Sequence, residues 1–335
     1  MVITKQSIGI DVSKDSLDVV FKEQNGSQVK IKGSRKFDNK PNGFSQLLEW
    51  CNKREKCDNI IYVLEATGVY HEELLCFLYN NGKNVCLELP QRIKYFAKSK
   101  GIKTKNDKVD SKTIADYGLE RQLRFWQPPS EQFRKLRDLS REHTDITNLK
   151  TVVQNRLHAA KHAHGKEIKT INRYYDQIKF YENQLKDIET DIKSVLKKDK
   201  KLSAKLNNVV SIKGIGIITA VKIIAETGGF YLFSSISQLV SYAGLDVVEN
   251  QSGNKFGKTK ISKKGNSNLR KSLYMPALSA IQYDNKMKSL NDRIMKTHIY
   301  KKQAIVAVMR KLLILVYTLW KNDELYDENY VWNQA

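Results

Sequence analysis

A carboxylate inside an apolar strand is the sequence feature that most constrains this fold. The stretch from Ile8 to Phe21 begins Ile-Gly-Ile-Asp-Val, and its alternating side chains predict a buried β-strand around Asp11. A buried carboxylate is costly unless a cation or hydrogen bonds compensate it, and Gly9 leaves room for a group to approach the backbone. Asp11 is therefore a candidate metal ligand. The alternative is an aspartate that ends the strand and turns the chain.

Strands and helices alternate after this first strand. A continuous hydrophobic run ends at Glu65 and predicts a second buried strand that is covered on both faces. The alternation predicts an α/β domain over residues 1–128, and ligands of such sheets gather beyond the carboxyl ends of the strands, where Glu65 lies. This second buried strand is expected at Asn59 to Glu65. Further strands are expected at Ser16 to Phe21, Gln28 to Lys32 and Asn84 to Leu89, and helices at Gly43 to Asn52 and His71 to Asn80.

The composition favours a nucleic acid as partner. Among 335 residues, 58 lysines and arginines oppose 36 aspartates and glutamates, which gives a formal net charge of +22 spread along the chain. The four cysteines lack the spacing of a zinc site, so we expect reduced core residues in a cytoplasmic protein. A strand that begins at Ser7 argues against a signal peptide. The apolar run Leu312 to Trp320 is too short to span a bilayer, so no membrane partner is expected.

Two aspartates stand within a basic run between Arg92 and Lys112. If a helix begins near Asp107, then Asp107 and Asp110 lie on one face of it, with Cβ atoms about 5–6 Å apart. Both residues also have an ordinary explanation, in which Asp107 caps the helix and Asp110 pairs with a lysine. The pair alone does not decide between these interpretations.

A helical segment is expected over residues 129–200, after the break Gln127-Pro128-Pro129. Apolar residues recur at steps of three and four from Phe133 to Ala160 and from Ile178 to Val195, which predicts two coiled-coil-like helices. The polar linker His164 to Arg173 would join them. This segment predicts a helical hairpin or a subunit contact.

Residues 201–327 are expected to form a mainly helical domain, followed by a tail at 328–335. A Gly-x-Gly turn at Gly214 and Gly216 resembles a helix-hairpin-helix motif, which can aim backbone amides at a phosphate, although a tight turn needs the same glycines. The helix Gln303 to Leu319 is expected to pack in the core. The candidate nucleic-acid-binding residues are Lys105, Lys108, Lys213, Gly214, Gly216, Lys258, Lys260, Lys263, Lys264, Arg270 and Lys271.

Asp11, Glu65, Asp107 and Asp110 can converge on one crevice of one sheet. Four such carboxylates repel one another and take up protons unless hard divalent cations neutralise them. Two Mg²⁺ ions about 4 Å apart can activate a nucleophile and stabilise the leaving oxygen of a phosphodiester. Beside a basic surface, this arrangement predicts metal-dependent cleavage of DNA.

Five motifs in this order resemble those of the DEDD insertion-sequence transposases, the family numbered one hundred and ten that is related to the Piv and MooV invertases. They are Ile-Gly-Ile-Asp at 8–11, Leu-Glu-Ala-Thr-Gly-Val-Tyr at 64–70, Lys-Asn-Asp-Lys-Val-Asp at 105–110, Ile-Lys-Gly-Ile-Gly at 212–216 and the long motif at 261–277. The resemblance implies an N-terminal RuvC-like (RNase H-like) domain with Asp11, Glu65, Asp107 and Asp110 as its acidic set. It also implies a C-terminal transposase domain with Ser252 as nucleophile, and a bridge RNA that pairs with donor and target DNA.

Without the resemblance, Ser252 in its Gln-Ser-Gly-Asn loop has the pattern of an ordinary turn serine. A serine that attacks the phosphate would instead retain the bond as a phosphoserine link, so that a free 3′-hydroxyl can rejoin without ATP. Because Asp110 and Ser252 belong to different domains, we expect a composite site in a homo-oligomer, either a dimer or a tetramer.

Three other functions fit parts of the sequence. A RuvC-like junction or structure-specific endonuclease would use water instead of Ser252 and leave no protein on the DNA. A sugar-kinase or actin-like ATPase also begins with a strand and an early aspartate, but no Gly-rich adenosine loop follows and the charge suits nucleic acid better. A non-catalytic nucleic-acid scaffold would use the acidic residues only as caps and ion pairs, so its binding would be indifferent to the loss of Asp11.

Overall fold

The computed structural model describes residues 5–66, 68–102, 106–231, 233–249, 251–252, 255–256, 260–297 and 300–328. The chain divides into two compact units, Met1–Pro128 and Pro129–Ala335. The boundary falls between two prolines, which lack a backbone donor and interrupt regular structure. The further division of the second unit into segments 129–200 and 201–327 stays a prediction.

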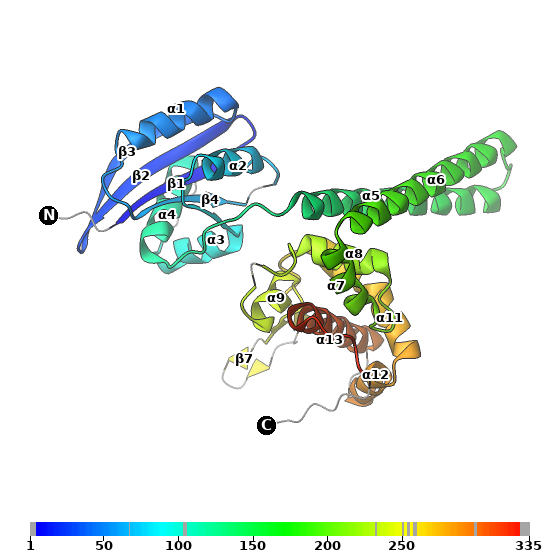
Figure 1. Ribbon diagram of the computed structural model, residues 1–335. Helices are drawn as coiled ribbons and strands as arrows, with labels where there is room; N and C mark the ends of the chain where they lie inside the picture. Colours follow the sequence, from blue (N-terminus) through cyan, green and yellow to red (C-terminus); the bar gives the residue numbers. More distant parts are fainter. Residues whose placement is uncertain are drawn as a thin grey trace. The chain divides into compact units, whose positions relative to one another are not determined.

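The first unit is built on a five-stranded mixed sheet with the strand order β3-β2-β1-β4-β5 (Figure 1). The strands are β1 (Lys5–Val12), β2 (Ser16–Asn25), β3 (Gln28–Asp38), β4 (Ile60–Glu65) and β5 (Val85–Glu88). The first three strands are antiparallel neighbours, whereas β4 is parallel to β1 and β5 is parallel to β4. The carboxyl ends of β1, β4 and β5 therefore lie at the same edge of the sheet.

Helices cover both faces of this sheet (Figure 1). They are α1 (Pro41–Asn52), α2 (Glu72–Asn80), α3 (Pro90–Ser99) and α4 (Asp107–Glu120). Ile10 and Leu64 pack with α1 and α2 in one hydrophobic core, whereas Val63 packs with α3 and α4 in a second core on the other face. Because β4 lies between two cores, both of its faces are buried, as its hydrophobic run predicts.

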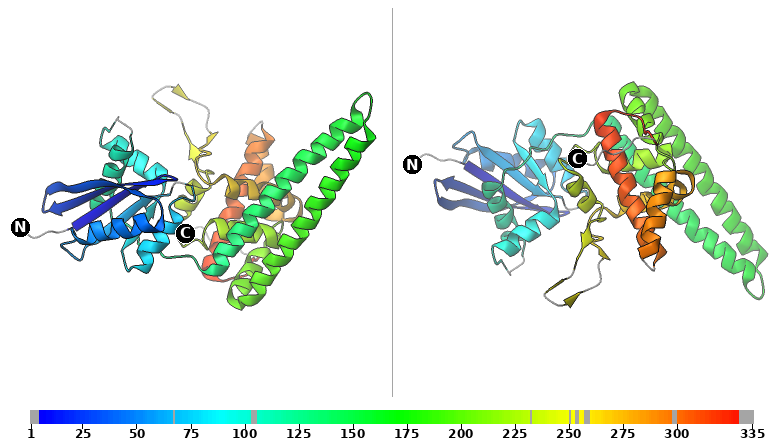
Figure 2. Two further views of the ribbon diagram at one scale, coloured as in Figure 1. Left: turned by 90° about the horizontal axis from the view of Figure 1, so that it is seen from above. Right: turned by 90° about the horizontal axis from the view of Figure 1, so that it is seen from below.

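The second unit begins with two long helices, α5 (Glu131–His162) and α6 (Ile168–Lys198), which lie side by side (Figures 1 and 2). They confirm the expected helical hairpin, while its assignment as a coiled coil stays a prediction. The prediction that the linker extends from His164 to Arg173 is wrong for residues 168–173, which belong to α6. Glu167 caps α6 by accepting a hydrogen bond from the Lys169 nitrogen at 3.2 Å, so the helix begins earlier than its apolar periodicity indicates.

Shorter helices form the rest of the second unit around one hydrophobic core. Val308, Leu312 and Val316 of the last helix are buried in this core, which confirms the predicted core helix. By length and composition, this is also the one helix in the described part of the chain that could cross a membrane. The helices are α7 (Lys200–Val210), α8 (Ile217–Glu226), α9 (Ile236–Tyr242), α10 (Ser267–Ser272), α11 (Tyr274–Tyr283), α12 (Asn285–Thr297) and α13 (Lys301–Asn322).

Two short strand pairs extend from the helices between α9 and α10 (Figure 2). Strand β6 (Val247–Val248) pairs with β9 (Lys260–Ile261), and β7 (Gln251–Ser252) pairs with β8 (Lys255–Phe256), both antiparallel. We call the four strands β6 to β9 the β-arm. Ser252 therefore lies in the β-arm, where the sequence predicts a polar loop. The α/β first unit and the mostly helical second unit confirm the predicted fold class, and the helix-hairpin-helix assignment stays a prediction.

Candidate active site

Asp11 and Glu65 are neighbours at the carboxyl edge of the sheet. In the parallel pairing of β1 with β4, Ile10 lies opposite Leu64, so the next residues of the two strands are Asp11 and Glu65. Successive side chains of a strand point to opposite faces. Both carboxylates therefore lie on the face away from Ile10 and Leu64, which is the face that α3 and α4 cover.

The helix that carries Asp107 and Asp110 packs on this same face. Asn106 caps α4 by accepting a hydrogen bond from the Val109 nitrogen at 2.8 Å, so both aspartates lie in the first turn of the helix. The alternative in which Asp107 itself caps the helix is therefore wrong. Asp107 is exposed and Asp110 is half-buried.

Gly9 allows α4 to approach β1 closely. A Cβ atom at this position would lie 2.3 Å from both the Ala115 nitrogen and the Ser111 carbonyl oxygen. Only glycine permits two backbones to come this close. The room that Gly9 leaves beside Asp11 is thus taken by the helix that carries the other two aspartates.

Negative charge accumulates around Asp11. Partial burial, followed by the negative charges of Asp110, Asp107 and Asp18, raises the pKa of the Asp11 carboxyl to about 6 against an opposing backbone hydrogen bond from Val12. Such charges act most strongly over short distances in a partly desolvated site. Asp107 and Asp110 are therefore electrostatic neighbours of Asp11.

We call Asp11, Glu65, Asp107 and Asp110 together the acidic row. Two further carboxylates lie beside Asp11 and Glu65 across the sheet, and the sequence patterns did not indicate them. Asp18 lies opposite Asp11 in the β1–β2 pairing, and Glu88 lies opposite Glu65 in the β4–β5 pairing. Asp18 forms an ion pair with a lysine of β3 at 3.3 Å, and Glu88 forms one with an arginine of α3 at 3.2 Å. The short turn between β1 and β2 is the signal that could have revealed Asp18, because turn length sets the register of a hairpin.

The acidic residues do not form a closed metal cage. Among the residues that the structure describes, no group of three histidine, cysteine, aspartate or glutamate side chains could hold a metal ion. The neighbouring carboxylates nevertheless offer the oxygen donors that Mg²⁺ prefers, together with a surplus of negative charge. The metal site formed by Asp11, Glu65, Asp107 and Asp110 stays a prediction.

We expect Asp11→Asn to stabilise the metal-free protein at pH 8. The pKa of Asp11 in the folded protein is about 6, above its ordinary value of 3.8, so the stability linked to its protonation is full below about pH 4 and is lost as the pH rises through 6. An amide escapes this loss, and the expected gain is about 1–2 kcal/mol after allowance for partial exposure. Thermal unfolding in a chelator at pH 4 and pH 8 measures the effect.

The matched control for this experiment is Asp15→Asn. Asp15 is an exposed carboxylate in the turn after β1, so its replacement removes the same charge outside the acidic row. We expect no pH-dependent gain from it. An equal gain from Asp11→Asn at both pH values would show that repulsion within the site is not the cause.

Ser252 and part of the predicted basic surface are incompletely described. The backbone of Ser252 pairs with Lys255, whereas its side chain lies outside the described atoms. Lys105 and Lys258 lie outside the described residues, as does the side chain of Lys108. Their roles stay predictions.

Exposed lysines lie on strand β9, on helix α10 and on the turn between them. Lys260, Lys263, Lys264 and Lys271 are all exposed. Arg270 instead donates a hydrogen bond from Nη1 to the Ala243 carbonyl at 2.8 Å, so it also holds the turn after α9 in place.

The two glycines between α7 and α8 have different surroundings. Gly214 has a φ of 93°, and a Cβ there would lie 2.7 Å from the Pro276 carbonyl oxygen, so packing against α11 already requires this glycine. Gly216 caps α8 and has open space beside it. Of the two, Gly216 is therefore the one whose backbone is open to a phosphate, while Lys213 beside them forms an ion pair with Glu328.

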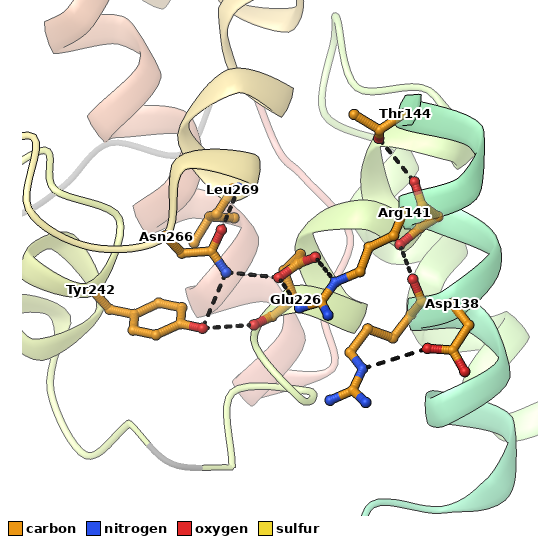
Figure 3. Close-up of polar contacts among 9 residues, drawn as sticks. Asp138, Arg141, Thr144, Glu226, Tyr242, Asn266 and Leu269 are labelled. Atoms are coloured by element: carbon orange, nitrogen blue, oxygen red, sulfur yellow. Dashed lines mark hydrogen bonds and ion pairs between the residues drawn. The ribbon is translucent and has the colours of Figure 1, made fainter. Parts of the chain in front are cut away.

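A polar network around the buried side chain of Glu226 supports the start of α10, beside the exposed lysines (Figure 3). Glu226 of α8 accepts hydrogen bonds from Arg141 Nε at 2.7 Å and from Asn266 Nδ2 at 2.7 Å, and Asn266 in turn caps α10. Burial opposes ionisation of Glu226, but these hydrogen bonds outweigh it and lower the pKa of its carboxyl. The Tyr242 hydroxyl donates to the Glu226 carbonyl at 3.2 Å. The network joins α5, α8, α9 and α10, and the sequence offered only one sign of it, an acid at the end of an apolar helix.

Comparison with known proteins defines the class of this chain as a transposase. A family model for DEDD transposases of the IS110 type matches residues 8–161, which include the acidic row. A second model, described as Transposase IS116/IS110/IS902 family, matches residues 206–291, which include the β-arm. The chain belongs to this IS110 family of transposases, and it is therefore an enzyme of DNA recombination.

The similarity to individual relatives extends over nearly the entire chain. The pilin gene-inverting proteins of Moraxella bovis and Moraxella lacunata are each 30% identical over 332 residues, which cover 97% of this chain and 99% of each relative. The transposase for insertion sequence element IS1111A of Coxiella burnetii is 23% identical over 296 residues, which cover 79% of this chain and 78% of the relative. The solved RuvC structure of Thermus thermophilus is 14% identical and covers 36% of this chain and 99% of its own, with a TM-score of 0.28, which is too low to support an argument.

Proposed function

We propose that this transposase cleaves and rejoins DNA strands through a covalent serine–phosphate intermediate in a Mg²⁺-dependent reaction. The observation that carries the proposal is the position of Asp11 beside Glu65, with Asp107 and Asp110 on the helix that covers the same face. The strand order and directions support a RuvC-like (RNase H-like) assignment for the first unit. Because the chain belongs to a family of transposases, we infer that the substrate of the acidic row is a DNA phosphodiester.

The acidic row would hold one or two Mg²⁺ ions. Asp11, Glu65, Asp107 and Asp110 supply carboxylate oxygens, and the raised pKa of Asp11 indicates negative charge that a cation would relieve. A bound Mg²⁺ ion would lower the pKa of a nucleophile and neutralise charge on the phosphate. The protein would hold these four carboxylates in place because they lie on the strands of the sheet and on helix α4.

The β-arm would supply the nucleophile. Ser252 Oγ forms a bond to the phosphorus of the scissile phosphodiester, the bond from phosphorus to O3′ breaks, and the serine proton passes to the leaving O3′. The DNA is left with a 5′-phosphoserine link and a free 3′-hydroxyl. Attack by a 3′-hydroxyl on this link reverses the step and rejoins DNA without ATP, which is what recombination requires and hydrolysis does not provide.

The basic segments would hold the nucleic acids. Lysines contact phosphates without reading sequence, so the exposed cations near α10 and the β-arm fit donor and target DNA but do not select a site. A bridge RNA that pairs with both DNAs would supply that selection. The relatives named for inversion and transposition support strand exchange. In this proposal the exchange takes place within a homo-oligomer in the bacterial cytoplasm.

The nucleic acid that accompanies the protein tests this proposal. The protein is purified from cells that also carry the genomic DNA on both sides of its gene, and the bound nucleic acid is extracted and sequenced. We expect a discrete structured RNA transcribed from that flanking DNA. Random fragments would instead favour the alternative function, a RuvC-like junction or structure-specific endonuclease that uses water as nucleophile.

A further inference from the structure

The chain folds back over the turn between α7 and α8 after its last helix. We call residues 323–328 the C-terminal strap. Asp323 Oδ1 accepts a hydrogen bond from Asn208 Nδ2 at 2.9 Å, and the backbone nitrogen of Tyr326 donates to Ser211 Oγ at 2.8 Å. Asn208 and Ser211 belong to the end of α7 and to the turn that follows it. The strap therefore lies directly beside the predicted phosphate-binding turn.

Tyr326 anchors the strap in the second unit. Its hydroxyl donates to Asp284 Oδ2 at 2.7 Å, and Asp284 is 1% exposed and also accepts a hydrogen bond from the Met287 nitrogen at 2.9 Å at the start of α12. The Tyr326 ring packs against the hydrophobic core. The strap is thus a fixed part of the fold up to this residue, and Glu328 follows two residues later.

Glu328 reaches the predicted nucleic-acid contact itself. One carboxylate oxygen forms an ion pair with Lys213 Nζ, and the other accepts a hydrogen bond from the backbone nitrogen of Asn285 at 3.3 Å. The Lys213 ammonium lowers the pKa of the Glu328 carboxyl, which is therefore ionised at neutral pH. A lysine and a backbone amide at the start of a helix are also the partners that a phosphate oxygen takes in proteins.

We propose that Glu328 occupies the place of a nucleic-acid phosphate on Lys213 and Asn285, so that the strap competes with DNA or RNA for this part of the binding surface. This inference rests on the proposed function, in which Lys213 contacts nucleic acid. The ion pair is partly exposed, with 46% of the Lys213 side chain and 27% of the Glu328 side chain accessible. Exposed ion pairs are weak, so a phosphate can displace the carboxylate while Tyr326 stays anchored.

Such competition would suit a chain with a formal charge of +22. A strongly basic protein binds any polyanion, and most of that binding is independent of sequence. A carboxylate that must be displaced lowers the affinity for every polyanion that takes Lys213 by the same factor. A complex with many other contacts still forms, whereas weak binding to random DNA falls further. The strap would therefore limit weak binding at this surface.

Binding of a short fluorescein-labelled DNA duplex of random sequence, measured by fluorescence anisotropy with the full-length protein, tests the competition. We expect Glu328→Gln to tighten binding about 3–10-fold at low salt, because the amide leaves Lys213 to the DNA. The matched control is Glu324→Gln in the same strap, whose carboxylate accepts a hydrogen bond from Asn322 at 3.4 Å. It removes the same charge and should change binding by less than about 2-fold.

Lys213→Gln separates this inference from the proposed function. We expect Lys213→Gln to weaken binding, and the double variant Lys213→Gln/Glu328→Gln to bind no more tightly than Lys213→Gln alone, because the two effects act through one contact. Equal tightening by Glu328→Gln and Glu324→Gln would overturn the competition in favour of a general charge effect. No tightening by Glu328→Gln, although Lys213→Gln weakens binding, would also overturn it. Unchanged binding by Lys213→Gln would instead remove Lys213 from the proposed nucleic-acid surface.

Discussion

Ser252→Ala is expected to abolish the covalent attachment of the protein to cleaved DNA. The variant lacks the one oxygen that can form the phosphoserine link, so we expect a loss of at least about a thousand-fold in adduct formation. No charge is removed and the β-arm keeps its backbone pairing, so DNA binding should stay within about 2-fold of the wild type. A denaturing gel of end-labelled substrate that carries the flanks of the gene measures the adduct, and anisotropy measures the binding.

Ser194→Ala is the matched control for this result. Ser194 is an exposed serine on α6 in the same unit, and its loss should leave adduct formation unchanged. Adducts that persist with Ser252→Ala would exclude Ser252 as the attachment point. Cleavage that continues in the variant without any adduct would favour the alternative function, in which water is the nucleophile.

The positions of Asp11 and Glu65 follow from local patterns in the sequence, whereas the roles of Asp107 and Asp110 do not follow from their spacing alone. Asp11 interrupts an apolar strand, and Glu65 follows the hydrophobic run of a doubly covered strand. The carboxyl ends of parallel strands lie at the same edge of an α/β sheet. The pairing of Ile10 with Leu64 then places the two carboxylates together. The spacing of Asp107 and Asp110 predicts that they share one helical turn, but it does not reveal that Asn106 caps the helix.

The remaining features depend on contacts between residues that are far apart in the sequence. The packing of α4 against Gly9 requires that two backbones meet, and periodicity within each element does not reveal their distance. The same is true of Arg141 with Glu226 and of Lys213 with Glu328, where each residue alone has the pattern of a solvated charge. The start of α6 was misplaced for a different reason, because polar residues at a helix end carry no hydrophobic period.

Asp110→Asn should abolish strand cleavage while it lowers the pKa of Asp11. The substitution removes one proposed metal ligand and the negative charge that, after burial, contributes most to the raised pKa of the Asp11 carboxyl. We expect cleavage to fall by at least about a thousand-fold, and carboxyl ¹³C NMR of the metal-free protein should show Asp11 titrating well below its wild-type pKa of about 6. Glu120→Gln is the matched control on the same helix, since its carboxylate forms an exposed ion pair with Lys100 at 2.7 Å and lies outside the acidic row. If Asp110 has a purely structural role, its replacement would reduce cleavage without changing the pKa of Asp11. An unchanged pKa would therefore show that Asp110 does not lie beside Asp11, and it would remove Asp110 of α4 from the proposed metal ligands.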